Sequence, residues 1–88
     1  MASKTVIVGS AVGLHARPAS LIAQAAEAFD DEILLKLEDA DDDDAVDAAS
    51  SLMIMTLGAE KGASVVVTSD NAEAVEAIAA LIEKDLDA

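Results

Sequence analysis

The spacing of apolar and polar positions along the chain predicts four strands and three helices. β-Branched residues at 5–8 indicate one strand, and apolar positions that alternate along 33–37 and 63–67 indicate two more. Apolar residues that recur every three or four positions predict amphipathic helices over 18–29 and 75–86. Each of these elements has one apolar face to bury.

The middle of the chain consists of an acidic segment followed by an apolar one. Residues 38–44 are almost wholly acidic and cannot enter a core, so they predict a solvated hairpin loop, followed by a short return strand over 45–48. The apolar segment 52–57 predicts a short helix, because Ser50 or Ser51 can cap its first turn.

Residues at the predicted helix boundaries complete the fold. Gly58 is expected to end the short helix, and Asp70 with Glu73 resembles a capping box at the start of the last helix. The order β-α-β-β-α-β-α predicts a single α+β domain over 1–88. We expect a two-layer sandwich, in which three helices cover one face of a four-stranded antiparallel sheet.

The amino-acid composition limits the kinds of partner that the protein can bind. The net charge of -13 argues against nucleic acids and anionic membranes, because the summed field of the protein repels both. Cysteine is absent, so disulfides and thiol chemistry are excluded. The sequence opens with no charged-then-apolar leader and has no apolar run near the roughly 20 residues that cross a bilayer. We therefore expect a cytoplasmic protein without membrane insertion.

The stretch GLHARPAS, residues 13–20, holds the only histidine and the only proline of the chain. A lone histidine is most often an ordinary surface residue. Pro18, however, is tolerated only in the first turn of a helix, which places His15 at or just before the helix N-terminus. There the free backbone N–H groups and the positive end of the helix dipole favour an anion.

The same stretch indicates reversible phosphorylation of His15. A histidine imidazole is largely neutral near pH 7 and is then a competent nucleophile. A phosphoryl group on the ring would face the helix N–H groups, and Arg17 could add a charge-assisted hydrogen bond. These residue types in this order therefore favour a phosphohistidine that is not buried.

Other chemistries fit the sequence less well. A metal site lacks a second histidine or any cysteine, and the acidic run 41–44 lacks the glycine and bidentate glutamate of a calcium-binding EF-hand loop. A Ser-His-Asp hydrolase lacks its G-x-S-x-G elbow, and neither glycine-rich nucleotide motif is present. We expect no metal and no cofactor.

The stretch SSLMIMTLG allows two interpretations. In one, all of its apolar side chains belong to the core. In the other, they are too many for one short helix to bury, and exposed Met and Leu side chains form an adaptable docking surface. The residues expected to dock partners are Leu14, Leu52, Met53 and Met55. Ser50, at the start of the helix, is also a place where phosphorylation would add charge beside that surface.

The two stretches together resemble a known family. GLHARPAS is similar to the active-site signature of HPr, the histidine-containing phosphocarrier family of the phosphoenolpyruvate-dependent sugar phosphotransferase system. LMIMTLGAEKGASV resembles the stretch around that family's regulatory serine and fourth strand, and the match runs from the first strand to the last helix. The resemblance implies an open-faced β-sandwich and a phosphoryl carrier that is not itself an enzyme.

The resemblance also implies roles for single residues. His15 would accept a phosphoryl group on Nδ1 from enzyme I, which takes it from phosphoenolpyruvate, and would pass it to the IIA domain of a sugar permease. Arg17 matches the arginine that assists transfer, and Ala16 with Pro18 matches the helix start. Ser50 matches the serine that a regulatory kinase phosphorylates in some members. The expected partners are enzyme I, a IIA domain and such a serine kinase, and the expected state is a monomer.

This chain departs from the family at several places. Ala49 and Ser51 flank Ser50 where many members carry a basic or apolar pair, and the acidic loop 38–44 is longer than usual. Gln24 and Glu27 stand where family members tend to present basic residues for acidic partners. The partners therefore either differ in charge or meet in high salt, where electrostatic steering is screened.

Two other functions account for the sequence less well than the phosphocarrier. An HPr-like regulatory module acting mainly through Ser50 has no need of His15. An inert, salt-adapted binding domain leaves the clustering of His15, Arg17 and Pro18 unexplained. The phosphocarrier is the function that the sequence favours.

The acidic composition predicts adaptation to a salt-rich cytoplasm. Eighteen acidic residues must share a small surface, over a core rich in alanine and valine. At about 1 M salt the Debye length falls to roughly 3 Å, which screens their repulsion. We expect the free energy of unfolding, measured by denaturant titration at increasing salt concentration, to rise with salt. A free energy that does not depend on salt would contradict this prediction.

Overall fold

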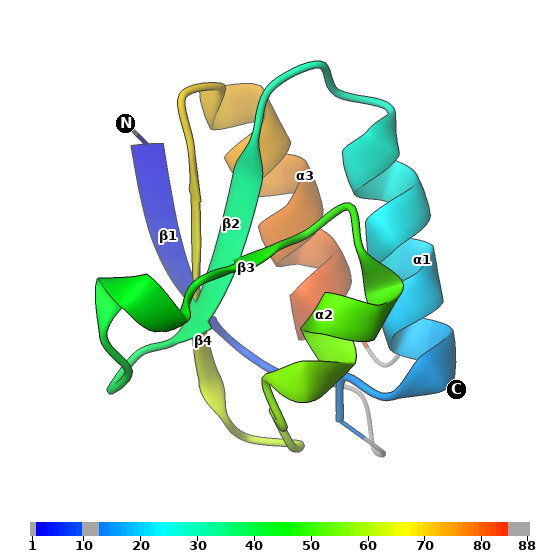
Figure 1. Ribbon diagram of the computed structural model, residues 1–88, viewed down its shortest axis with the longest axis vertical. Coiled ribbons are helices and arrows are strands. Elements are labelled where there is room, and N and C mark those ends of the chain that lie inside the picture. The colour runs from blue at the N-terminus through cyan, green and yellow to red at the C-terminus, as the bar shows by residue number, and fades with distance from the viewer. Residues whose placement is uncertain (1, 10–12, 85–88) are drawn as a thin grey trace.

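The computed structural model describes residues 2–9 and 13–84 of the chain. Its elements, shown in Figure 1, are β1 (Ala2–Ile7), α1 (Ala16–Glu27), β2 (Ile33–Leu37), the 3-10 turn η1 (Asp42–Asp44), β3 (Val46–Asp47), α2 (Ser51–Thr56), β4 (Ser64–Ser69) and α3 (Ala72–Glu83). The predicted order of strands and helices is confirmed. β1 begins three residues earlier than predicted, and β3 is shorter than the predicted return strand. The end of the predicted last helix, at 85–86, lies outside the described residues.

The four strands form one antiparallel sheet in the order β1-β4-β2-β3. β4, the last strand in the chain, therefore lies inside the sheet, where Val65 pairs with Val6 of β1 and with Leu37 of β2. α1 and α3 lie on one face of this sheet, with α2 packed beside α1 (Figure 1). This is the predicted open-faced α+β arrangement.

The core lies between the sheet and the helices. In β4, Val65, Val67 and Ser69 are buried while the residues between them are half-buried, which is the alternation of a strand with one covered face. α1 turns a stripe of mostly small residues toward the core and packs against α2 and α3. Its buried residues are Pro18, Ala19, Ile22, Ala23 and Ala26. No helix within 2–9 and 13–84 is long and apolar enough to span a bilayer.

The start of α3 corrects the predicted capping box. The N-cap is Asn71, whose Oδ1 accepts hydrogen bonds from the N–H groups of Glu73 (3.0 Å) and Ala74 (3.3 Å). Its side-chain nitrogen donates to Asp31 at 3.0 Å, and its backbone N–H donates to Oγ of the buried Ser69 at 3.2 Å. An amide can accept and donate at once, which a carboxylate at Asp70 cannot do. The predicted capping role of Asp70 is therefore wrong.

This cap gives a direct test by substitution. Asn71→Ala removes the acceptor of two helix N–H groups, so we expect the free energy of unfolding to fall by about 1 kcal/mol. Asp70→Ala is the matched control, and because Asp70 is exposed we expect it to change the free energy by less than about 0.5 kcal/mol. Denaturant titration at fixed salt measures both. Equal losses in the two variants would show that the cap is assigned to the wrong residue.

Candidate functional site

His15 is the N-cap residue of α1. Its backbone is extended (φ -91°, ψ -160°), and its carbonyl oxygen accepts the N–H of Ala19 at 2.8 Å. Its imidazole is exposed and makes no capping hydrogen bond within the described part of the chain. The ring is therefore anchored through the backbone only and is open to a reacting group from outside.

A close contact between two loops holds His15 in this position. Leu14 donates its backbone N–H to the carbonyl oxygen of Ala59 at 2.9 Å. Gly13 has φ +75°, and a Cβ on it would come within 2.5 Å of the same carbonyl oxygen. Only glycine combines that backbone conformation with that approach. Gly13 is the first residue of the stretch GLHARPAS, but its contact could not be predicted from the sequence, because Ala59 has no chemical feature that stands out.

Leu14 anchors the loop from the other side. Its side chain is only 2% exposed and belongs to the apolar core. The prediction that Leu14 contributes to a docking surface is therefore wrong, because a buried side chain has no surface to offer. Its burial instead fixes the residue before His15 against the core.

The first turn of α1 leaves hydrogen-bond donors beside the imidazole. The first backbone N–H groups of any helix have no acceptor within the helix. Pro18 lacks an N–H, and Ala19 already donates to His15, so Ala16 and Arg17 carry the two N–H groups after His15 that the helix leaves free. As the sequence predicts, this places free donors and the positive end of a helix dipole next to His15.

Arg17 is exposed in the same turn. Lys4 of β1 forms an ion pair with Glu76 of α3 at 2.9 Å, and the hydrogen bond and charge of Glu76 raise the pKa of Lys4, but no ion pair joins Arg17 to any of the described side chains. None of the described carboxylates therefore pairs with Arg17, despite the excess of acid in this chain. Its guanidinium is available for an anion held at His15.

α2 divides its apolar residues between the core and solvent. Ser50 caps the helix, because its Oγ accepts the N–H of Met53 at 3.3 Å, and the positive φ of Gly58 (+65°) follows its last turn, both as predicted. Ile54 is fully buried, whereas Leu52 is 69% and Met53 is 43% exposed. Met55 is half-buried and packs against the core. The core interpretation therefore holds for Ile54, and the docking interpretation holds for Leu52 and Met53.

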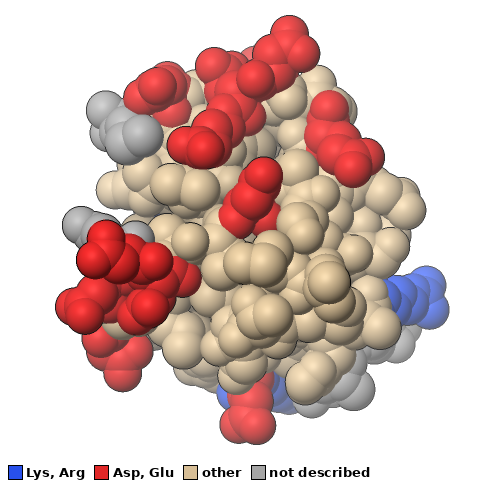
Figure 2. Space-filling view, in the orientation of Figure 1, with Lys and Arg blue, Asp and Glu red and all other residues tan. Residues whose placement is uncertain are grey.

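Acidic residues are nearly absent from α1 and α2. α1 and α2 pack against each other and contain a single acidic residue, Glu27, at the last position of α1. Figure 2 shows carboxylates gathered over the loops at the upper and left margins, with an uncharged expanse over α2. We call the exposed surface of these two helices the α1–α2 face; it includes Gln24, Leu52 and Met53. Among the described residues no three His, Asp or Glu side chains are placed to hold a metal ion.

Comparison with family models and curated proteins gives consistent matches. The model described as the PTS HPr component phosphorylation site matches residues 2–84. The phosphocarrier protein HPr of Streptomyces coelicolor is 41% identical over 90 residues, which covers 99% of this chain and 94% of that protein.

Solved structures agree with these matches. HPr-C-His from Thermoanaerobacter tengcongensis superposes with a TM-score of 0.84 at 33% identity, over all of this chain and 98% of that one. The phosphocarrier protein HPr from Bacillus anthracis gives a TM-score of 0.81 at 33% identity, over 92% of this chain and 95% of that one. An HPr dimer from Thermoanaerobacter tengcongensis gives 0.67 at 34% identity, over 98% of both chains.

Proposed function

The chain belongs to the HPr family of the phosphotransferase system, and from this premise we propose that it carries phosphoryl groups on His15 between two other proteins. The observation that supports His15 most strongly is its place as the exposed N-cap of α1, next to two N–H groups that the helix leaves free and to Arg17, which pairs with none of the described carboxylates. The donor would be enzyme I, charged by phosphoenolpyruvate, and the acceptor the IIA domain of a sugar permease.

The transfer step needs little from this protein beyond position and charge. The lone pair of the imidazole nitrogen Nδ1 forms a bond to phosphorus while the bond between phosphorus and the donor breaks, and the same exchange runs at the acceptor. The phosphoryl oxygens bring negative charge to the start of α1. The N–H groups of Ala16 and Arg17 and the guanidinium of Arg17 can receive that charge. Because the charge is solvated and not buried, the group can leave again.

The α1–α2 face would dock the donor and the acceptor in turn. Leu52 and Met53 are exposed beside Met55, and flexible Met side chains can repack against different partners. A carrier of this kind is a stoichiometric intermediate and not an enzyme. We propose that it acts in the cytoplasm and as a monomer, since one exposed face suffices for both exchanges.

Regulation through Ser50 has less support. Its hydroxyl oxygen already accepts the N–H of Met53, and its neighbour Ala49 borders a group of carboxylates that includes Glu27 and Asp47. A phosphate on Ser50 would add charge beside others of the same sign. A serine kinase therefore remains a secondary partner in this proposal.

Phosphorylation in the test tube checks the proposal. The chain is incubated with phosphoenolpyruvate and its cognate enzyme I, and intact mass is measured before and after acid treatment. We expect one acid-labile phosphoryl group on the wild type and none on His15→Ala. Arg17→Ala should slow transfer by about tenfold or more, because it removes a charge-assisted hydrogen bond, and should leave the free energy of unfolding nearly unchanged.

Three results would count against it. They are no phosphorylation of the wild type, phosphorylation that survives in His15→Ala, and an Arg17→Ala variant that either unfolds or transfers at the wild-type rate. Circular dichroism of each variant at the assay's salt concentration separates a folding defect from a transfer defect.

A further inference from the structure

The sulfur atoms of this protein all belong to methionines, because the chain has no cysteine. Met53 and Met55 lie in α2, and Met1 lies outside the described residues. Met53 is 43% exposed, next to the exposed Leu52, whereas Met55 is half-buried and packs against the core. A peroxide dissolved in the solvent therefore has better access to the side chain of Met53 than to that of Met55.

The backbone at Met53 is held by hydrogen bonds that do not involve its thioether. Its N–H donates to Oγ of Ser50 at 3.3 Å, and its carbonyl oxygen accepts the hydroxyl of Thr56 at 2.6 Å. The next residue, Ile54, is fully buried and anchors the helix in the core. A chemical change at the end of the Met53 side chain therefore alters the surface of α2 and leaves its fold intact. The same change at Met55 would disturb packing against the core.

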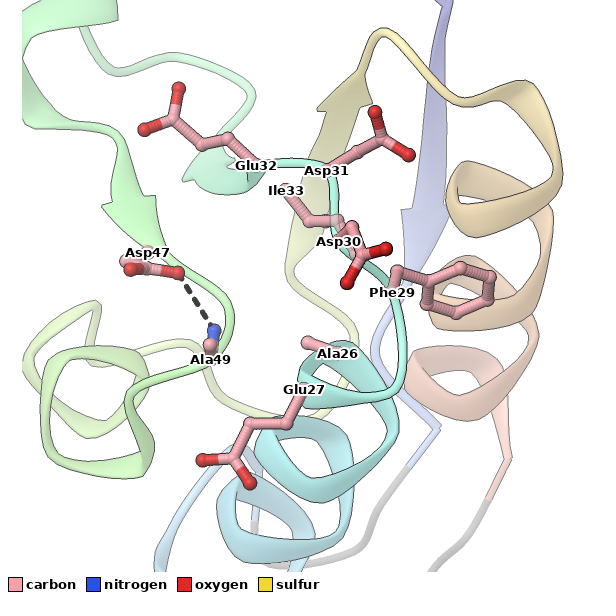
Figure 3. A pocket seen from close by; sticks show the side chains of 9 residues that line it. All are labelled: Ala26, Glu27, Phe29, Asp30, Asp31, Glu32, Ile33, Asp47 and Ala49. Carbon is pink, nitrogen blue, oxygen red and sulfur yellow. Dashed lines mark hydrogen bonds between the residues drawn. The ribbon is translucent and has the colours of Figure 1, made fainter.

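The helix surface around Met53 is uncharged, because α2 contains neither acidic nor basic residues. Charges gather instead at the margin of the α1–α2 face. A hollow of about 250 Å³ lies there, and its lining includes Glu27, Asp47 and Ala49, the last of which comes two residues before α2. Figure 3 shows these side chains around the hollow. A polar oxygen on the sulfur of Met53 would stand apart from these charges, on an apolar part of the face.

We propose that Met53 is a site of reversible oxidation that lowers the affinity of the carrier for its partners. This inference rests on the proposed function, because it needs partners that cover the α1–α2 face. The sulfur of Met53 attacks hydrogen peroxide, the O–O bond breaks, one oxygen atom stays on the sulfur and the other leaves as water. The sulfur loses the two electrons that the peroxide gains. A methionine sulfoxide reductase returns the thioether with a dithiol as reductant, which becomes a disulfide as the oxygen leaves as water.

The sulfoxide changes docking and not the transfer step. Its oxygen accepts hydrogen bonds from water, and it loses them without replacement when an apolar partner surface covers Met53. His15 and Arg17, which carry the transfer, lie at the start of α1 and keep their positions. Oxidation should therefore act on the affinity for the partner. A partner that already covers Met53 should in turn protect it from the peroxide.

Oxidation with hydrogen peroxide, followed by the masses of peptide fragments, measures the modification directly. We expect Met53 to gain one oxygen atom faster than Met55, and enzyme I to slow the reaction at Met53. Met53→Leu is the resistant variant, because Leu keeps an apolar side chain of similar size without sulfur. Met55→Leu is the matched control. Circular dichroism of the wild type oxidised at Met53 should show its helices unchanged.

Steady-state phosphorylation by enzyme I gives the functional readout. We expect brief oxidation to raise KM on the order of tenfold for the wild type and for Met55→Leu, with kcat unchanged, because one polar group must be buried on docking. Met53→Leu should keep its KM after the same treatment, which also controls for oxidation of Met1. Methionine sulfoxide reductase with a dithiol should restore the KM of the wild type.

The outcomes separate this inference from the proposed function. Equal oxidation rates at Met53 and Met55 would overturn the inference, and so would a KM that rises as much in Met53→Leu as in the wild type. A wild type that enzyme I phosphorylates equally well before and after oxidation of Met53 would contradict the inference alone. A wild type that is not phosphorylated even before oxidation would contradict the proposed function, and the inference with it.

Discussion

The hydrogen bond between the N–H of Leu14 and the carbonyl oxygen of Ala59 joins two stretches that lie far apart in the sequence. On one side is the loop that leads into His15, and on the other is the segment that follows α2. Gly13 makes the contact possible because it has no Cβ to strike Ala59, and Leu14 secures it by entering the core. The position of His15 relative to the α1–α2 face depends on this contact.

Charge in this molecule is distributed as unevenly as its apolar residues. Eighteen acidic residues crowd a small surface, yet only Glu27 falls in α1 or α2. In a domain with a radius of gyration of 11.1 Å, the carboxylates of the loops necessarily lie near the α1–α2 face. They can, however, be kept off the two helices. A face whose one acidic residue lies at the end of α1 allows an apolar partner surface to approach, and none of the described carboxylates pairs with Arg17.

Local patterns in the sequence were sufficient for most of the fold. The alternation of apolar residues predicted both ends of β2 correctly, and Pro18 placed His15 correctly at the start of α1. Both patterns arise from residues that are neighbours in the chain.

The wrong predictions concern contacts between residues that lie far apart in the sequence. Asp and Asn are both favourable N-cap residues, so the sequence alone does not choose between Asp70 and Asn71. The hydrogen bonds of Asn71 with Ser69 and Asp31 favour Asn71 as the N-cap. Leu14 looked like a loop residue free to dock, and its burial depends on how the loop folds back on the core. The hollow beside Glu27 is lined by two stretches that lie apart in the sequence, one within residues 26–33 and one within 47–49, so no local spacing could indicate it.

The central claim is that the start of α1 receives the phosphoryl group on His15. Proton–nitrogen correlation spectra of the chain before and after phosphorylation test it at single residues. The account predicts that the amide protons of Ala16 and Arg17 move downfield as they donate to the phosphoryl oxygens, while amides of α3 stay in place. Unchanged signals from Ala16 and Arg17 in a chain that carries the phosphoryl group would contradict it.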